Sequence, residues 1–385
     1  MDVNQQFHMN GGNGETSYSS NSSLQRKGVE ITKPIIEETI IEIVNTMYLA
    51  SPAANIRKSI SIADMGCSSG PNALLVVSYI MNAVFKTLLR DSDGVSRASA
   101  HPEILVFLND LSGNDFNSTF KSLQGFYDEL KKTYNILSGH EGNQRQQPCF
   151  VAGIPGSFYG RLFPADRLHF VHSSYSLHWL SQVPQGIEKI NKGNVYMVES
   201  SPPSVVEAYL NQFERDFELF LKCRSEEVVK GGRMVLTTSG RANDVRPCSK
   251  EHCLVWELVA NILSDMLSQG KIEAEKLESF HVPLYIPSSS EVKSIILREG
   301  SFIINRLETF EVTLDGVGDD GKLDGRSNAD VMVNSLRAIS EPLVASHFGE
   351  EIIEELFGRL GVMFGAYLPK GKNKTLGIVI SLVRQ

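Results

Sequence analysis

The stretch Ser59-Ile-Ser-Ile-Ala-Asp-Met-Gly-Cys-Ser-Ser-Gly-Pro-Asn72 decides the fold of this chain of 385 residues. It opens on a short apolar run, residues 59–64, that is typical of a buried strand. Gly66 and Gly70 follow, and glycines at this point allow a tight turn and a close approach of the backbone to a ligand. Because a helical pattern comes next, over residues 72–90, the stretch predicts a strand, a glycine turn and a helix.

Strand and helix patterns alternate along the rest of the chain. Helices are predicted over residues 33–49 and 115–134, with Pro34 in the first turn of the former. Further strands are predicted over residues 104–109, 168–172, 231–238, 302–312 and 376–383. Since strands alternate with helices over residues 59–240, the sequence predicts an α/β fold with a doubly wound parallel sheet.

Two kinds of segment interrupt this alternation. Residues 248–297 are mainly helical and predict an insertion over the carboxyl ends of the strands, where α/β sheets bind ligands. Residues 138–147 and 316–328 are polar or glycine-rich and predict surface loops.

Composition excludes several classes of protein. The chain has 37 Lys and Arg against 45 Asp and Glu, a net charge of −8, and no basic tract, which argues against nucleic-acid binding. No apolar run reaches the roughly 18–20 residues that a membrane span needs. The first 21 residues lack the basic and apolar regions of a secretory signal, so a cytoplasmic protein is expected.

The cysteines predict neither disulfides nor a metal. There are five of them, at irregular spacings, which favours free thiols in a reducing compartment. Cys248 and Cys253 flank His252, but this spacing is loose for zinc and no second pair follows. We therefore expect no metal site.

Acidic residues beside the glycine turn indicate a ligand. Asp64, two residues before Gly66, suits a positively charged amino group, and Asp110, at the end of the next strand, suits ribose hydroxyls. The glycine spacing differs from that of dinucleotide and P-loop motifs. Together these features favour S-adenosylmethionine, a nucleoside with a charged amino-acid tail and no phosphate. The alternative is a plain strand–turn–helix corner with a capping aspartate.

The sequence resembles the plant SABATH methyltransferases, which methylate small carboxylic acids or xanthine nitrogens with S-adenosylmethionine. The resemblance runs from about His8 to Arg384. It rests on residues 8–12, 15–18, 21–25, 64–72, 108–117, 155–164 and 173–184. A finer likeness to the salicylate and benzoate carboxyl methyltransferase branch rests on residues 201–205, 221–227 and 300–308. The family implies an enzyme with a Rossmann-like class I methyltransferase sheet and an inserted helical cap.

The resemblance also implies a division of the chain. Residues 1–30 would form an arm that closes over the active site, although their composition alone predicts a flexible tail. Residues 31–243 would form the S-adenosylmethionine-binding core and residues 244–300 the helical cap. Residues 301–385 would add the last core strands, with further cap elements at about 313–370. Relatives are often homodimers, so a homodimer acting on a small molecule, without nucleic acid or membrane, is expected.

The family implies a set of cofactor-binding residues. Asp110 would bind the ribose, and Ser157 and Phe158 would lie at the adenine. The full set is Tyr18, Ser22, Asp64, Gly66, Asn72, Asp110, Leu111, Ser157 and Phe158.

For the methyl acceptor, the family implies a carboxylate held between Gln25 on the arm and the indole of Trp179. Both can donate hydrogen bonds and neither carries a charge that would quench the nucleophile. A carboxylate is already ionised at pH 7, so we expect no catalytic acid or base. The alternative for Trp179 is a core aromatic residue. The other implied pocket residues are Tyr175, His178, Thr238, Ser239, Val255, Trp256, Tyr285, Leu336 and Ile339.

Some positions depart from the salicylate branch and leave the acceptor open. His178 stands where salicylate-specific members often have Met, and Thr238 with Ser239 replaces a usually apolar pair. Asn10 replaces a basic residue of some members. The pair Thr238 and Ser239 suits an acceptor more polar than salicylate or differently placed. His178 and this pair also suit a xanthine N-methyltransferase, against which Gln25 speaks. The alternatives are an exposed tip residue at Asn10 and strand-end hydroxyls bonded to nearby backbone at Thr238 and Ser239. A relative that binds a small acid without turnover is a third possibility, and the intact cofactor motif argues against it.

Overall fold

A single sheet of seven strands organises the computed structural model. The sheet has the order β3-β2-β1-β4-β5-β7-β6. The structure describes residues 7–49, 59–90, 102–138, 149–313, 328–367 and 374–385. The strands are β1 (Ser59–Met65), β2 (Glu103–Asp110), β3 (Phe150–Pro155), β4 (Leu168–Ser174), β5 (Val228–Gly240), β6 (Phe302–Thr313) and β7 (Lys374–Arg384).

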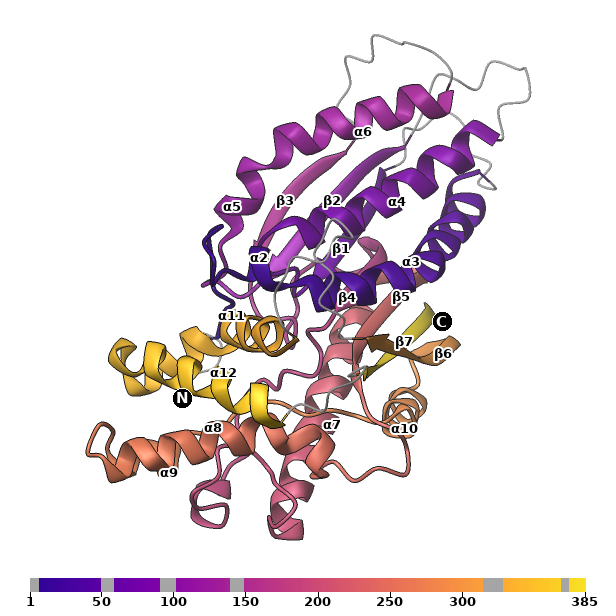
Figure 1. Cartoon of the computed structure of the whole chain (residues 1–385). Coiled ribbons are helices and arrows are strands. Elements are labelled where there is room, and N and C mark those ends of the chain that lie inside the picture. The colour runs from indigo at the N-terminus through magenta and orange to yellow at the C-terminus, as the bar shows by residue number, and fades with distance from the viewer. Residues whose placement is uncertain (1–6, 50–58, 91–101, 139–148, 314–327, 368–373) are drawn as a thin grey trace.

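The parallel sheet predicted from the sequence is confirmed for β1 to β5, which pair in parallel. The two later strands, which lie outside the alternation over residues 59–240, complete the far edge of the sheet, where β7 lies between β5 and β6 and runs antiparallel to both. The reason lies in the connection that precedes β7. Both helices between β6 and β7 stay at the end of the sheet where β6 finishes, so β7 starts at that end and runs back (Figure 1).

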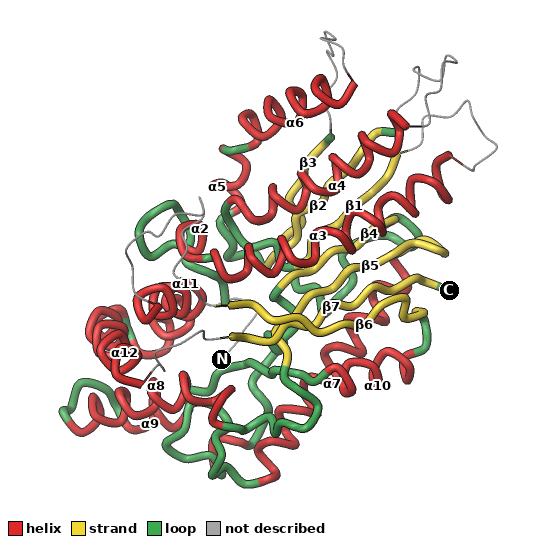
Figure 2. Tube along the Cα trace, turned by 45° about the vertical axis from the view of Figure 1, so that its right-hand side comes forward, coloured by secondary structure: helices red, strands yellow, loops and turns green. Residues whose placement is uncertain are grey.

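Helices cover the sheet in two groups. Along one face lie α3 (Ser23–Ile43), α4 (Pro71–Arg90) and α6 (Leu123–Ser138), and Figure 2 shows them running beside the strands. On the other side α7 (Pro203–Glu227) packs against β5, and α10 (Ser289–Glu299) packs against α7 and β6. The buried apolar residues accordingly form two clusters, one for each side of the sheet.

A further group of helices lies beyond the carboxyl ends of the strands, apart from the helices that cover the two faces of the sheet (Figure 1). In this group α8 contacts α9 and α12, and α11 contacts α12 and α2. The group comprises α8 (Lys250–Ser268), α9 (Ala274–Ser279), α11 (Asn328–Phe348) and α12 (Ile353–Tyr367). The short elements are α2 (Tyr18–Asn21), α5 (Phe116–Lys121), η1 (Val44–Leu49), η2 (Ile187–Lys189) and η3 (Glu350–Ile352).

Several boundaries differ from the sequence prediction. The helix predicted over residues 33–49 begins ten residues earlier, at Ser23, so Pro34 lies inside it and not in its first turn. The α-helix ends at Ile43. Burial of the earlier turns, including Gly28 and Val29, outweighs the proline's preference for a first turn. The segment 115–134 forms α5 and α6, with Asp115 capping α5 by accepting from the Ser118 amide. Strand β3 and helix α7 were not predicted from the sequence, and the predicted loops 138–147 and 316–328 lie almost wholly outside the described residues.

Contrary to the expectation from the sequence, one helix among the described residues has the length and apolarity of a membrane span. This apolar stretch is Pro71–Leu89, within α4, and 56% of it is buried inside the fold. The helix packs between α3 and α6, and the glycine turn positions its first residue, Pro71. Proline suits this position because a first-turn amide needs no partner within the helix.

A buried ion pair ties α7 to the loop that follows β3. The side chains of Arg224 and Glu227 are both 0% exposed, with Nε and Oε2 2.8 Å apart. Arg224 donates to the carbonyls of Phe158 (2.9 Å) and Gly160 (2.8 Å). Glu227 accepts from the amide of Leu162 at 2.6 Å. The pair therefore holds the residues 158–162 in place.

We predict that Glu227→Gln lowers the free energy of unfolding by about 3–5 kcal/mol, since it leaves a buried guanidinium without its counter-charge. Denaturation by urea, followed by circular dichroism, measures the loss. Glu226→Gln is the matched control, because Glu226 pairs with Arg161 at the exposed surface and should change stability by less than about 1 kcal/mol. Equal losses for the two variants would contradict this role.

Candidate active site

A cavity of about 210 Å³ lies at the carboxyl ends of the strands. The arm, the glycine turn, the ends of β2, β4 and β5, and helix α11 all contribute to its wall. Twelve of the predicted site residues line it: Tyr18, Gln25, Gly66, Asp110, Leu111, Ser157, Phe158, Tyr175, His178, Trp179, Ser239 and Ile339. The cavity therefore joins predicted cofactor residues to predicted acceptor residues.

Asp110 connects three segments at one end of this cavity. Its Oδ2 accepts from the amide of Ser68 at 2.7 Å, and its Oδ1 accepts from the amide of Leu111 at 2.8 Å. Its carbonyl accepts from the amide of Gly156 at 2.8 Å. The carboxylate is thus aimed by backbone groups, and each of its oxygens keeps a lone pair for a ligand hydroxyl.

The pKa of Asp110 is raised to about 6, chiefly because the surrounding protein removes the carboxyl from bulk water. The two backbone amides oppose this shift and lower the pKa, while the nearby charge of Asp64 raises it. Asp64 itself is buried beneath the turn, with its Oδ1 2.7 Å from Nδ1 of His172, and it is not part of the cavity wall. Asp110 is therefore ionised at neutral pH and protonated in mild acid.

The arm is docked on both the sheet end and the helical group. Its Gly12 amide donates to Asp115 Oδ2 at 2.9 Å, and its Asn10 amide donates to the carbonyl of Ala338 on α11 at 2.9 Å. Ser19 lies so close to the glycine turn that a Cβ on Gly70 would be 2.9 Å from its Cα. The described part of the arm is thus docked beside the cavity, and Tyr18, Leu24 and Gln25 line its wall.

Ser22 and Asn72, two predicted cofactor residues, are hydrogen-bonded to each other in this structure. Asn72 Nδ2 donates to Ser22 Oγ at 2.9 Å and to its carbonyl at 3.2 Å. Neither residue is part of the cavity wall. The contact joins the start of α3 to the start of α4 and so holds the arm against the glycine turn.

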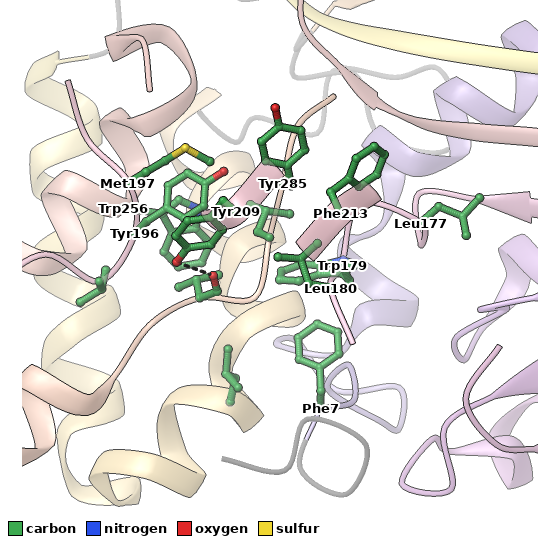
Figure 3. Close-up of a cluster of buried hydrophobic side chains, with 14 of the residues drawn as sticks. Phe7, Leu177, Trp179, Leu180, Tyr196, Met197, Tyr209, Phe213, Trp256 and Tyr285 are labelled. Atoms are coloured by element: carbon green, nitrogen blue, oxygen red, sulfur yellow. Dashed lines mark hydrogen bonds between the residues drawn. The ribbon is translucent and has the colours of Figure 1, made fainter. Parts of the chain in front are cut away.

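Three neutral side chains can donate hydrogen bonds at the other end of the cavity. Gln25 lines the cavity, its Oε1 is buried without a partner, and its amide Nε2 is a neutral donor. Trp179 has its indole packed between the rings of Phe7 and His178, with centroids 4.5 and 5.8 Å away. Figure 3 shows Phe7 directly beside Trp179 and Leu180. Tyr159 fixes the backbone at Trp179 by donating from its hydroxyl to the Trp179 carbonyl at 2.6 Å.

His178 is the third donor, and its neighbours determine its tautomer. The amide of Ser239 donates to His178 Nδ1 at 3.4 Å, and Thr238 Oγ1 lies 3.1 Å from the same nitrogen. Burial lowers the pKa of His178 to about 3, so the ring is neutral. Because Nδ1 accepts, the single proton of the neutral ring is on Nε2, which becomes a donor at the cavity.

The remaining predicted acceptor residues lie away from the cavity wall. Tyr285 is fully buried, stacks on Phe213 at 5.1 Å and donates from its hydroxyl to Glu291 at 3.1 Å. Trp256 belongs to the apolar cluster beside Tyr196 and Met197 (Figure 3). The wall also omits Thr238, Val255 and Leu336.

The structure adds cavity residues that the sequence analysis did not single out. Some lie in stretches already recognised as motifs, where the strand ends and the arm could have pointed to them. These residues are Phe7, His8, Met9, Leu24, Ser68, Tyr159, Ser174, Ser176, Leu180, Ser181 and Thr375. Within the described ranges no lysine or arginine lines the cavity and no group of three metal-ligating side chains forms. All five cysteines are buried free thiols.

The fold and the site together define a class of protein. A seven-stranded sheet in this order, with a glycine turn after β1 and an acidic residue at the end of β2, is the class I S-adenosylmethionine-dependent methyltransferase fold. The residues present fit the cofactor, since the Asp110 carboxylate is aimed at the cavity and the buried Ser68 and Ser174 hydroxyls have no partner.

Comparison with known proteins identifies the family. The family model of the SAM-dependent carboxyl methyltransferases matches residues 4–385, and the chain belongs to this family. The chain is 45% identical to the salicylate carboxymethyltransferase of Clarkia breweri, over 100% of this chain and 99% of that one. It is 40% identical to the 3,7-dimethylxanthine N-methyltransferase 1 of Coffea arabica, over 100% and 98%.

A solved structure supports the same assignment. Loganic acid methyltransferase, solved with SAH, is 32% identical, with a TM-score of 0.80 over 98% of each chain. The family predicted from the sequence motifs is thus confirmed, and the protein is an S-adenosylmethionine-dependent methyltransferase.

We predict that the KM for S-adenosylmethionine rises as the pH falls through about 6, the pKa of Asp110. Protonation removes an acceptor for ribose hydroxyls, so at pH 5 the KM should be roughly 10-fold higher than at pH 7.5. Initial rates at saturating acceptor measure it. Asp110→Asn should raise the KM at every pH and flatten the profile, and an Asp110→Asn profile that still bends near pH 6 would contradict the assignment.

Proposed function

We propose that the protein transfers the methyl group of S-adenosylmethionine to the carboxylate of a small planar aromatic acid of the salicylate or benzoate type, giving a methyl ester. The observation that carries this proposal is the set of neutral donors, Gln25, Trp179 and His178, at one end of the cavity. A carboxylate needs several donors, whereas a neutral purine nitrogen that attacks a methyl group needs its lone pair free.

The neutrality of these donors matters for the reaction. S-adenosylmethionine supplies a methyl group on a positively charged sulfur, and the acceptor oxygen must approach it in line with the carbon–sulfur bond. Gln25 and Trp179 orient the carboxylate without a counter-charge, which preserves its nucleophilicity. Phe7 and Leu180 pack beside the indole and exclude water. No group need remove a proton, and His178 stays neutral throughout the physiological range.

At the cofactor end, we propose that Asp110 binds the ribose and that Ser157 and Phe158 contact the adenine. The amides of Ser68 and Leu111 fix the carboxylate, and Arg224 fixes the backbone of Phe158. Tyr18 lines the same cavity from the arm, so that closing the arm completes the cofactor site. Asp64, Ser22 and Asn72 would then support the turn and the arm from beneath rather than from the cavity wall.

The alternative is N-methylation of a xanthine, and one observation favours it. The His178 Nε2 proton can be donated to a purine carbonyl as well as to a carboxylate. The Thr238 hydroxyl, which could make the same kind of contact, lies 3.1 Å from His178 Nδ1. Gln25 remains the feature that favours the carboxylate. We further propose that the protein works as a homodimer in the cytoplasm, in keeping with the family resemblance and the free cysteines.

A substrate panel tests the proposed function. Salicylate, benzoate and related acids are compared with xanthine, 7-methylxanthine and theobromine, using S-adenosylmethionine labelled in the methyl group. Base-labile label marks a methyl ester and base-stable label marks an N-methyl product. We expect base-labile product from at least one acid. Transfer only to xanthines would overturn the carboxyl proposal.

We predict that Gln25→Ala lowers kcat/KM for the carboxylate acceptor about 10- to 100-fold, the range expected for losing one hydrogen bond to a charged group. Any activity toward xanthines should fall much less. Gln124→Ala, on the exposed surface of α6, is the control and should leave both activities unchanged. An equal loss for carboxylates and xanthines would remove the role assigned to Gln25.

A further inference from the structure

A glycine inside helix α3 lies against the cavity wall. Gly28 is buried, and a glycine at such a position weakens a helix relative to alanine, so a packing reason is expected. That reason is Tyr175. A Cβ on Gly28 would lie 2.3 Å from the Tyr175 hydroxyl oxygen, 2.4 Å from Cε2 and 2.7 Å from Cζ. The outer end of the tyrosine ring therefore occupies the space that any other residue at position 28 would fill.

Tyr175 comes directly after β4 and has a constrained backbone. Its φ is +56°, which few residues other than glycine adopt, and its amide donates to the carbonyl of Thr237 at 2.9 Å. Its ring lines the cavity and meets the His178 ring edge-on, with centroids 6.4 Å apart. The ring thus has helix α3 on one side and the cavity on another.

Helix α3 is not free to retreat from this contact. It packs along its length on α4 and also contacts β4, β5 and β7. The Thr32 hydroxyl donates back to the Gly28 carbonyl at 3.0 Å, within the same helix. Since both backbones are fixed, a larger residue at position 28 would displace the Tyr175 ring, and the space open to it is the cavity.

We infer that Gly28 is a specificity-determining residue. Because Gly28 has no side chain, the end of the Tyr175 ring fits against helix α3 and the acceptor end of the cavity stays wide. This inference rests on the proposed function, which puts the acceptor beside Gln25. Gly28 is three residues after Gln25 and so lies on the same face of α3. The protein then accepts acids larger than a single substituted ring.

The test is a series of acceptors of increasing size, measured with Gly28→Ala. The acids are benzoate, salicylate and 1-naphthoate, and the parallel series is xanthine, 7-methylxanthine and theobromine. In whichever series the unmodified protein uses, kcat/KM for the largest acceptor should fall at least roughly 10-fold, and that for the smallest less than about threefold. The KM for S-adenosylmethionine should change far less, because the nearest atoms to a Cβ on Gly28 all belong to Tyr175 and none to a predicted cofactor residue.

Two further variants separate this effect from a change in folding. Gly125→Ala, in α6, is the matched control, since a Cβ there meets nothing within 4 Å, and it should leave the size profile unchanged. Adding Tyr175→Leu to Gly28→Ala should restore the large acceptor relative to Gly28→Ala alone. In a protein that already carries Tyr175→Leu, Gly28→Ala should then have no further effect on the size profile. Such non-additivity of the two substitutions indicates direct contact between the two residues.

The outcomes distinguish the inference from the proposed function. A size profile unchanged by Gly28→Ala overturns the inference, and so does a Gly28→Ala protein that fails to fold, because the ring then cannot turn into the cavity. Melting temperature with and without S-adenosylhomocysteine identifies that second case. Transfer to xanthines alone overturns the proposed function, while the xanthine size series still tests Gly28.

Discussion

The structure depends on one carboxylate held at the end of a strand. Asp110 accepts hydrogen bonds from the amides that follow β1 and β2, and its carbonyl accepts from the turn that follows β3. These contacts fix three turns at the carboxyl edge of the sheet, where the cavity lies. The same carboxyl is kept out of bulk water, so that its pKa rises to about 6 and a ligand hydroxyl finds a strong acceptor.

The acceptor end follows the opposite principle, because its donors are neutral. His178 stays uncharged through burial, and the Ser239 amide forces its proton onto Nε2. Gln25 and Trp179 likewise carry no charge. Charge at the acceptor end is therefore left to the ligands, where a sulfonium and a carboxylate attract each other. The arm and the rings of Phe7 and Trp179 then reduce the water that would screen this attraction.

The sequence predicted the parts that local chemistry determines. The apolar run before Gly66 and the acid at position 110 predicted the first two strands and the cofactor end of the site. The antiparallel direction of β7 was not predictable from the sequence. It depends on the end of the sheet at which the helices between β6 and β7 lie, and that is a property of the tertiary structure. The tautomer of His178 and the contact of Gly28 with Tyr175 also could not be read from sequence, since each joins residues more than 60 positions apart or on separate elements.

The most direct test of this account is a crystal structure of the protein with S-adenosylhomocysteine and salicylate. The ribose hydroxyls should lie within hydrogen-bonding distance of Asp110. The salicylate carboxylate should contact Gln25 Nε2 and the Trp179 indole nitrogen, next to the sulfur of the cofactor product. A ribose bound elsewhere, or a carboxylate turned away from Gln25 and Trp179, would contradict this account.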